Sequence, residues 1–503
     1  MNQNILYNYL ILLIFLIMKP TKEQLDAMDL ANTHCSFKIS AYAGAGKTST
    51  LKLIGQTLSD KNGLYLAFNK SIAEEAGTKF DNNVECKTFH SMAFKGTPRY
   101  ITNKLQCKRL LPKAMSTMFD LRDYKVPLER DNNKSATCDP YDQSMIITRA
   151  IDLFCRSTSS SITQEMLLKA MPKWADKKYC IDLADGLVDK ANSLWNIYTD
   201  MTSQYKISHD IYLKYWALKD PIINSDFILF DEAQDADPIM LDILSKQSAQ
   251  VIYVGDRHQQ IYAFRGAINA MQSLPIKEVL LTKSFRFGLE IADIANTILF
   301  NLLDESIPLV GNEMKISCIT DVAKPDAYLS RTNAGALSTA LRLIIDGRKP
   351  KLNLDTTALL NIIEDAEKLK SGQLVKKSSE FFGFENWSEV VIYVEEFPNS
   401  DLVPVVTLIE SHGTEYLKNI IKQLLDSKET DCLVSTAHKA KGLEFKNVQL
   451  GSDYFWNKKQ EEPLMVPAEA RLLYVACTRA MEKLDISNMQ PLFNRLFANK
   501  IRS

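Results

Sequence analysis

The fold of this chain is decided by the stretch Ala41-Tyr42-Ala43-Gly44-Ala45-Gly46-Lys47-Thr48-Ser49. The apolar residues 37–41 in front of it predict a strand, and residues 49–54 behind it have the pattern of a helix. A loop of small residues between a strand and a helix start lets successive backbone N–H groups face one phosphate chain. In such a loop Lys47 reaches the β- and γ-phosphates, and the Thr48 hydroxyl ligates Mg²⁺. The stretch therefore predicts a nucleotide-phosphate site at the end of a strand.

The loop departs from the usual pattern at one position, because Ala41 stands where the first glycine is common,. Gly44 and Gly46 still permit a close approach of the backbone to phosphate, since neither carries a Cβ atom. We therefore expect phosphate binding despite the alanine.

The composition is that of an ordinary globular protein with several domains. The chain has 503 residues, of which 46% are apolar and 24% charged,. Its formal net charge is −1, so contact with a nucleic acid would need a local groove rather than a general positive field. The nine cysteines contain no Cys-x-x-Cys pair. This argues against a zinc module or a disulfide framework and favours a reducing compartment, the cytoplasm, nucleoid or nucleus.

The N-terminal residues 5–18 are nearly all apolar, but they are fewer than the roughly 17–25 residues of a membrane span. No Lys or Arg precedes them, so the basic start of a signal peptide is missing,. We interpret residues 1–19 as an over-extended start or a disordered leader in preference to a membrane anchor, and we expect no stable membrane association.

Aromatic and polar side chains follow the predicted strands of the first half. Strand 64–68 ends at Phe68 and is followed by Asn69, and His90 follows a short strand that begins at Val84. At the carboxyl edge of an open parallel sheet, such groups can stack on bases and contact phosphates. A lone histidine is more often structural than functional.

Two adjacent carboxylates, Asp231 and Glu232, follow the fully apolar strand 227–230. In a P-loop enzyme the first carboxylate at this place helps to hold Mg²⁺, and the second orients or deprotonates the attacking water. The strand lies too far along the chain from the loop at 41 for one strand–helix–strand unit. A helical insertion must therefore lie between them.

Two further strands end in groups that suit a site between nucleotide and nucleic acid. After strand 251–254 come Gln259, which suits a γ-phosphate contact, and the cluster Tyr262, Phe264 and Arg265, which suits base stacking,. After the next strand come Phe285 and Arg286, which fit an adenine stack and an arginine finger.

A capped helix opens the ordered part of the chain. Thr21 stands at the cap and Gln24 at the capping-box position,. Because Gln24 lies shortly before the phosphate loop, its amide could also read an adenine edge by donating and accepting. Residues 99–134 read as irregular helix with a local excess of basic residues. This segment is either a solvated helical face or part of a nucleic-acid track, and the pattern leaves both interpretations open.

Several segments in this order resemble superfamily 1 helicases of the UvrD/Rep type, the F-box DNA helicases among them. The resemblance covers about residues 20–490 and rests on Leu66-Ala67-Phe68-Asn69-Lys70-Ser71-Ile72-Ala73, Cys86-Lys87-Thr88-Phe89-His90-Ser91-Met92-Ala93, Gln259-Gln260-Ile261-Tyr262-Ala263-Phe264-Arg265-Gly266-Ala267, Ser284-Phe285-Arg286-Phe287-Gly288 and Thr436-Ala437-His438-Lys439-Ala440-Lys441-Gly442-Leu443-Glu444-Phe445.

The resemblance implies a set of site residues. The implied catalytic residues are Lys47, Asp231, Glu232, Gln259, Arg286 and Arg479, with ATP as cofactor and Mg²⁺ held by Thr48 and Asp231. The implied ATP-binding residues are Gln24, Ala43, Gly44, Ala45, Gly46, Lys47, Thr48, Ser49, Phe285, Gly442 and Glu444. The implied DNA-binding residues are Phe68, Asn69, His90, Tyr262, Phe264, Arg265, His438 and Lys441.

The resemblance also implies an α/β fold of two RecA-like P-loop lobes, parallel sheets flanked by helices. We expect the first lobe at 20–98 and 205–288 with a helical insertion at 99–204. We expect the second lobe at 289–345 and 426–503 with a reduced insertion at 346–425. Residues 327–333 and 432–436 predict strands of the second sheet, and a helix that begins near Glu469 is expected to carry Arg471 and Arg479 near one face.

These features together predict an ATP-driven motor that moves 3′→5′ on single-stranded DNA and unwinds duplex at a junction, in repair, recombination or replication-fork processing. Three alternatives stay open: a translocase that strips proteins from DNA, a subunit that serves a separate nuclease in repair or defence, and a motor on RNA. The polarity is implied by the resemblance alone.

Overall fold

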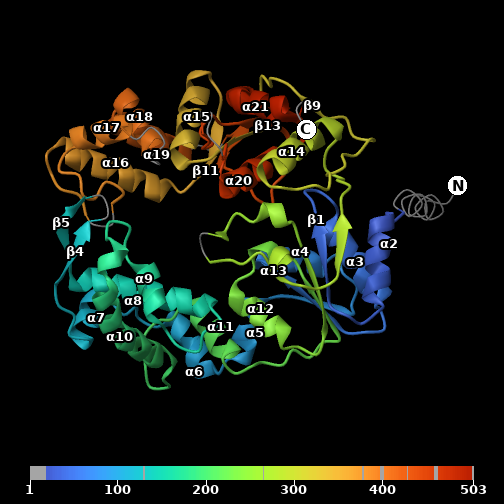
Figure 1. Ribbon diagram of the computed structural model, residues 1–503, viewed down its shortest axis with the longest axis horizontal. Coiled ribbons are helices and arrows are strands. Elements are labelled where there is room, and N and C mark those ends of the chain that lie inside the picture. The colour runs from blue at the N-terminus through green and yellow to red at the C-terminus, as the bar shows by residue number, and fades with distance from the viewer. Residues whose placement is uncertain are drawn as a thin grey trace.

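The computed structural model describes residues 19–128, 131–263, 266–376, 379–396, 402–426, 429–457 and 463–500. Residues 1–18 of the expected leader at 1–19 and two of the expected DNA-binding residues, Phe264 and Arg265, lie outside these ranges. Two six-stranded parallel sheets, each flanked by helices, form two lobes that meet along one side of the molecule (Figure 1). The predicted α/β fold of two RecA-like lobes is confirmed.

The first sheet has the strand order β3-β2-β6-β7-β1-β8, and all its neighbouring strands are parallel. Its strands are β1 (Phe37–Ala41), β2 (Gly63–Ala67), β3 (Val84–Thr88), β6 (Phe227–Phe230), β7 (Gln250–Gly255) and β8 (Glu278–Leu281). Parallel strands place their carboxyl ends at one edge, so the segments that follow β1, β2, β3, β6 and β7 meet there.

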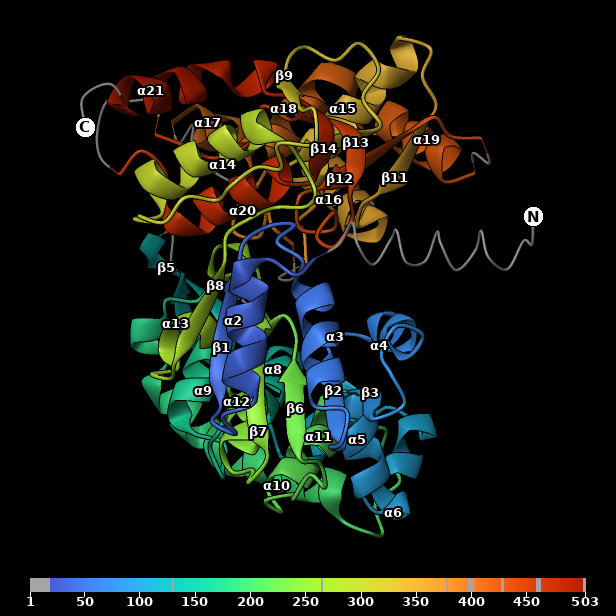
Figure 2. The same cartoon turned by 90° about the vertical axis from the view of Figure 1, so that its right-hand side faces the viewer.

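Both faces of the first sheet are buried, as its apolar strands require. Phe227 and Leu229 of β6 pack with the helices α2 and α3, whereas Ile228 and Phe230 pack on the opposite face. The helices of this lobe are α2 (Lys22–Ala31), α3 (Lys47–Thr57), α4 (Lys70–Gly77), α5 (Phe89–Gly96), α11 (His209–Ala217), α12 (Pro238–Ser245) and α13 (Ala270–Ser273). Figure 2 shows α2 and α3 lying over the sheet.

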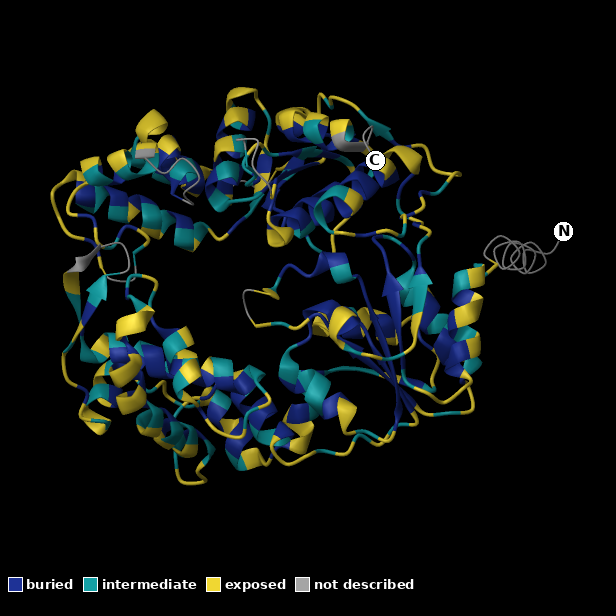
Figure 3. Ribbon diagram, in the orientation of Figure 1, coloured by how far each residue is buried: buried dark blue, intermediate teal, exposed yellow. Residues whose placement is uncertain are grey.

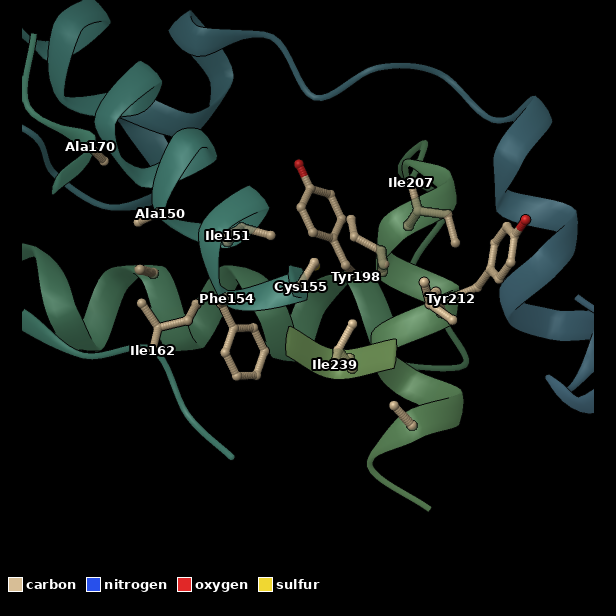
Figure 4. Close-up of a cluster of buried hydrophobic side chains, with 14 of the residues drawn as sticks. Ala150, Ile151, Phe154, Cys155, Ile162, Ala170, Tyr198, Ile207, Tyr212 and Ile239 are labelled. Atoms are coloured by element: carbon tan, nitrogen blue, oxygen red, sulfur yellow. The ribbon is translucent and has the colours of Figure 1, made fainter. Parts of the chain in front are cut away.

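The insertion between β3 and β6 is mostly helical and shares the core of the first lobe. Its helices are α6 (Arg99–Thr102), α7 (Pro112–Met118), α8 (Pro140–Arg156), α9 (Gln164–Ala170) and α10 (Ile181–Thr199). Side chains of α8 and α10, such as Phe154 and Tyr198, pack against Ile239 of α12 and Tyr212 of α11 (Figure 4). The insertion is therefore anchored on the motor lobe rather than tethered to it.

One expectation for the insertion is wrong. Residues 99–134 were expected to be helical, but the strands β4 (Tyr124–Leu128) and β5 (Asp131–Cys138) form an antiparallel hairpin. Val126 is buried whereas Lys125 is exposed, as the alternation of a half-buried strand requires. This alternation is too short in the sequence to distinguish the strand β4 from irregular helix.

The second sheet has the strand order β11-β12-β10-β13-β14-β9, again wholly parallel. Its strands are β9 (Cys318–Ile319), β10 (Ala327–Ser330), β11 (Pro350–Asn353), β12 (Cys432–Thr436), β13 (Phe445–Leu450) and β14 (Ala480–Asp485). The helices α14 (Leu289–Leu302), α15 (Asn333–Ile345), α20 (Pro467–Cys477) and α21 (Gln490–Lys500) flank it. Buried residues concentrate in both sheets and on the helix sides that face them (Figure 3).

Two boundaries in the second lobe need correction. β11 pairs with β12 in the second sheet, although it falls within the range 346–425 expected for the insertion. The helices that remain are α16 (Thr356–Lys370), α17 (Trp387–Glu396), α18 (Val403–His412) and α19 (Thr414–Asp426). The helix α20 ends at Cys477, so Arg479 lies just past its end and not on its face with Arg471.

The two lobes share a hydrophobic cluster, and so do not merely touch. Tyr42 and Ala43 of the phosphate loop belong to one apolar cluster with Ile298 of α14 and Tyr474 of α20. Within the part of the chain that the structure describes, no helix is long and apolar enough to cross a membrane.

Candidate active site

The phosphate loop runs from the end of β1 to the start of α3, as the sequence predicts. Gly44 and Gly46 have φ angles of 72° and 77°, a left-handed conformation that glycine adopts without a steric penalty. A Cβ atom on Gly44 would lie 2.6 Å from both Arg286 Cβ and Ser284 Oγ. The glycine therefore permits the link between the lobes to cross the loop at close range, and Phe285 N–H donates to Gly44 O at 2.8 Å.

A cavity of about 500 Å³ opens over this loop, between the two lobes. Eleven of the predicted ATP-site residues line it: Gly44, Ala45, Gly46, Lys47, Thr48, Ser49, Gln259, Arg286, Gly442, Glu444 and Arg479, together with Asp231 and Glu232. The structure thus brings residues from both halves of the chain to one site.

Lys47 and Glu232 form the electrostatic centre of this cavity. Lys47 Nζ lies 2.8 Å from Glu232 Oε1. Burial alone would lower the pKa of Lys47, but Glu232, Asp231 and Asp256 outweigh burial and raise it. Against the opposing effect of burial, Lys47 and Lys441 hold the pKa of Glu232 far below its usual range. Glu232 is thus an ionised carboxylate near neutral pH, and its φ of 54° is strained for a residue with a Cβ atom,.

Asp231 is buried and accepts a hydrogen bond from the Tyr65 hydroxyl at 2.7 Å. Burial and the neighbouring charge of Glu232 raise its pKa, so a cation beside Asp231 would be strongly favoured. Asp231 and Thr48 line the same cavity, and a carboxylate plus a hydroxyl is the oxygen donor set that Mg²⁺ takes when phosphates supply further ligands. Among the described residues, no group of three or more His, Cys, Asp or Glu side chains is placed so that it could hold a metal ion.

Two arginines close the cavity from the second lobe's side. Arg286 donates to Glu444 Oε1 from Nε at 2.8 Å and to Thr478 O from Nη1 at 2.8 Å. Arg479 is buried and donates from Nη2 to Gln259 Oε1 at 3.3 Å. Burial, and next the charge of Arg286, lowers the pKa of Arg479 to about 9. Two guanidinium groups in this arrangement create a strong preference for an anion such as a terminal phosphate.

The predicted adenine contacts lie at the other end of the loop. A Cβ atom on Gly46 would come within 3.2 Å of the Phe285 ring and 3.6 Å of Gln24 Nε2. Gln24 completes the capping box of α2, because its Oε1 accepts the Thr21 N–H at 3.0 Å. Its Nε2 donates to Thr50 Oγ1 at 3.0 Å. Gln24 is therefore a helix cap held beside the phosphate loop, and its role in adenine binding stays a prediction.

A second cavity, of about 190 Å³, lies beside the first on the lobe-1 side. The rings of Phe68 and Tyr262 lie nearly parallel, with centroids 6.2 Å apart. This is about half an ångström short of the roughly 6.8 Å, two stacking distances, that a base stacked on both faces needs. His90 lines the same cavity. Asn69 instead lines the nucleotide cavity and caps α4 by accepting the Ile72 N–H at 2.9 Å.

The two cavities have a common wall. Phe68, Asp231, Glu232, Asp235 and Tyr262 line both of them. Groups expected to meet a base and groups expected to meet a phosphate therefore belong to one layer of side chains.

Lys441 lies at this wall and not out in the second cavity. Its ammonium pairs with Asp235, lies 3.6 Å from Glu232 Oε2 and 5.4 Å from the centre of the Tyr262 ring. His438 is half-buried, and its carbonyl accepts the Tyr262 hydroxyl at 3.4 Å. The expected contact of Lys441 and His438 with a strand stays a prediction.

The structure also adds residues that sequence reasoning missed. The Tyr474 hydroxyl of α20 donates to Asp256 Oδ2 at 3.1 Å and accepts the Ala43 N–H at 3.2 Å. Glu305, in the segment after α14, accepts from Arg257 Nη2 and His258 Nε2, each at 2.7 Å. Burial would raise the pKa of Glu305, but these partners and two backbone N–H groups hold it at about 2. Of these residues, only Asp256 could have been predicted from the sequence, because it directly follows a buried strand.

A phosphate loop with a lysine, a strand that ends in two carboxylates, and two arginines define a two-lobe P-loop NTPase, because one arginine lies on the segment that links the lobes and the other follows a helix of the second lobe. Comparisons with known proteins narrow this class. Residues 24–265 match the family model described as "AAA domain", and residues 356–491 match the "UvrD-like helicase C-terminal domain". The chain belongs to the UvrD-like superfamily 1 helicases.

Two curated relatives are similar along most of the chain. F-box DNA helicase 1 of Gallus gallus is 30% identical over 492 residues, which cover 90% of this chain and 47% of that protein. F-box DNA helicase protein 1 of Schizosaccharomyces pombe is 29% identical over 496 residues, which cover 90% of this chain and 55% of that protein. The chain thus spans about half the length of these relatives.

Proposed function

We propose that this chain is an ATP-driven motor that moves 3′→5′ along single-stranded DNA and unwinds duplex ahead of it. The observation that carries the proposal is the common wall between the nucleotide cavity and the cavity of Phe68 and Tyr262. Because the two cavities share this wall, a structural change around the γ-phosphate would also move the rings that are proposed to contact a base. The family membership and the name of the relatives, DNA helicase, support DNA as the substrate, whereas the polarity rests on the family resemblance alone.

The proposed roles follow from the geometry. Backbone N–H groups of the loop and Lys47 bind the β- and γ-phosphates, while Thr48 and Asp231 would hold Mg²⁺, which neutralises developing charge on the phosphates. When Lys47 bonds to phosphate oxygens, Lys441 still lies beside Glu232 Oε2. Glu232 thus stays ionised and can take a proton from the attacking water.

The second lobe completes the site by contributing charge at the γ-phosphate. Arg286, on the segment that links the lobes, and Arg479, after α20, approach the loop only when the lobes are together, as they are here. Arginine fingers of this kind contribute about 10³–10⁵ to the rate. We propose that hydrolysis removes the anion between them, so that the lobes part and re-close one step further along the strand.

The lobe and insertion boundaries are part of the same proposal. We place motor lobe 1 around the first sheet, with the insertion at 99–204, and motor lobe 2 around the second, with α16–α19 as its reduced insertion. An intracellular site of action, at single-strand/duplex junctions in repair, recombination or fork processing, is the setting that this activity suits. Repair, recombination or nuclease proteins are the partners that we propose.

The deciding experiment measures ATP hydrolysis by the purified chain without nucleic acid, with single-stranded DNA and with single-stranded RNA. We expect strong stimulation by DNA. Unwinding is tested alongside on substrates with a 3′ or a 5′ tail, and only the 3′-tailed duplex is expected to open. Equal stimulation by RNA would point to an RNA motor, and stimulation without unwinding would point to a translocase that clears proteins.

The matched variant is Lys47→Ala, which removes the charge that meets the β- and γ-phosphates. We expect it to abolish DNA-stimulated hydrolysis, to below one hundredth of the wild-type rate. Undiminished turnover in Lys47→Ala would refute the assignment of the loop.

A further inference from the structure

The cavity of Phe68 and Tyr262 has a polar floor in which His90 meets two residues that no sequence motif singled out. His90 Nε2 lies 2.9 Å from Asp210 Oδ1, and Arg156 Nη2 donates to Asp210 Oδ2 at 3.2 Å. All three side chains line the cavity. One carboxylate therefore holds a histidine of the motor lobe and an arginine of the insertion at the same place.

Arg156 comes from outside the motor lobe but is rigidly placed. It is the last residue of α8, and its neighbours Phe154 and Cys155 are buried in the core that joins the insertion to α11 and α12 (Figure 4). Asp210 lies in the first turn of α11. The salt bridge between Arg156 and Asp210 thus spans two elements whose relative position is fixed by packing, and a guanidinium held in this way is pre-organised for a ligand.

The charge of the cavity indicates which part of a nucleic acid enters it. Five carboxylates line it: Asp210, Asp231, Glu232, Asp235 and Asp237. Among the described residues of this lining, Arg156 is the one guanidinium or ammonium. A phosphate would meet a mostly negative wall, whereas an uncharged base ring can lie against the aromatic rings of Phe68 and Tyr262 and present its edge to the floor.

The geometry points to Arg156 as a base-contacting residue of the strand site, with Asp210 as the positioning residue that aims it. This inference rests on the proposed function and deepens it, because it makes the insertion part of the nucleic-acid site. The guanidinium group suits the acceptor atoms of a base edge, such as a carbonyl oxygen of thymine. Arg156 thereby couples the motor lobe's stacking rings to the insertion.

The test uses the full chain and compares Arg156→Ala with Arg149→Ala. Arg149 lies on the same helix and is exposed, so it controls for loss of a positive charge. Affinity is measured by fluorescence anisotropy for an oligothymidylate and for an abasic strand of equal length that keeps the phosphates. We expect Arg156→Ala to weaken binding of the oligothymidylate about tenfold and binding of the abasic strand less than twofold, and Arg149→Ala to change neither.

Two further readouts separate a base contact from other roles. The slope of log affinity against log salt should be the same for wild type and Arg156→Ala, because loss of a phosphate contact would reduce it by about one. Arg156→Lys, which keeps the ion pair with Asp210, should recover only part of the affinity, since it lacks the planar fork. If Arg156→Ala has a lower melting temperature than Arg149→Ala, Arg156→Lys replaces it in the comparison of affinities for the oligothymidylate and the abasic strand.

Several results would overturn the inference. An equal loss on both strands, or a reduced salt slope, would make Arg156 a phosphate contact or a structural residue. No loss on either strand would remove it from the site altogether. These outcomes differ from failure of the proposed function, in which the wild-type chain would neither bind the oligothymidylate nor be stimulated by it.

Discussion

At the scale of single residues, Glu232 concentrates the chemistry of the site. Its backbone is strained in the left-handed region, and its side chain contacts both Lys47 and Gln234, whose Nε2 donates at 2.5 Å. Strain of this kind is kept where the surrounding structure over-determines a position. The orientation of Glu232 is therefore set by contacts with its neighbours and not by its own backbone preference.

Glu232→Gln should separate binding from hydrolysis. The amide has the same shape but accepts a proton poorly, so we expect nucleotide affinity within about threefold of wild type and a hydrolysis rate lower by about 10²–10⁴. Equilibrium binding of a fluorescent nucleotide and single-turnover hydrolysis measure the two effects. A variant that hydrolyses at the wild-type rate would assign the base to another group.

At the scale of elements, the contacts between the lobes are made by short segments after strands and helices. Arg257 and His258 follow β7, and Glu305 follows α14. Gln259 of the nucleotide site follows His258 directly in the chain, so the contact with Glu305 lies beside that site. We infer that Glu305 anchors the second lobe to the segment that carries Gln259.

The pH dependence of stability tests this anchor. The pKa of Glu305 is about 2 in the fold against an ordinary value of 4.5. Because the folded value is the lower one, the anchor stabilises the fold fully above about pH 4.5, and its contribution is lost as the pH falls toward 2.

Glu305→Gln should lower the melting temperature by the same amount at pH 8 and pH 6. The difference from wild type should shrink below about pH 4.5, where wild type loses the same contribution. Thermal melts of both proteins in a series of buffers check this. A gap that keeps its size down to the acid limit of folding would show that ionisation of Glu305 does not stabilise the fold.

The comparison of sequence and structure is clearest at this scale. Lys47, Asp231 and Gln259 were predictable because each follows a buried strand, and short-range pattern specifies both strand and loop end. Tyr474 and Ala43 lie 431 residues apart, and Glu305 has no local pattern, so their contacts depend on how the lobes pack. The hairpin of β4 and β5 was missed because few of its described side chains are buried. Arg156 was missed because an arginine that ends a helix is ordinary.

At the scale of the whole molecule, the two insertions touch each other. The rings of Trp174 and Phe382 lie 5.5 Å apart, edge to face. Lys173 and Glu380 approach to 3.6 Å beside them. Figure 1 shows β4 and β5 beside the helices of the second insertion, on the side opposite the contact between the motor lobes. The chain therefore closes on itself at two places.

Trp174→Ala should loosen the second of these contacts. An aromatic pair of this geometry contributes about 0.5–1.5 kcal/mol beyond its buried area, so amide hydrogen exchange in residues 379–387 should become about two- to tenfold faster. Lys173→Ala is the matched control, because Lys173 is exposed and a surface ion pair contributes little. Unchanged exchange in Trp174→Ala would mean that the contact does not hold the insertions together.

The common wall of the two cavities has a pharmacological consequence. A small molecule lodged against Phe68 and Tyr262 would press on the layer that also carries Asp231 and Glu232. Such a compound would slow ATP hydrolysis without displacing the nucleotide. Its inhibition would be non-competitive toward ATP, whereas excess oligonucleotide would relieve it. Resistance mutations in that layer would carry a fitness cost, since each of them would disturb two substrates at once.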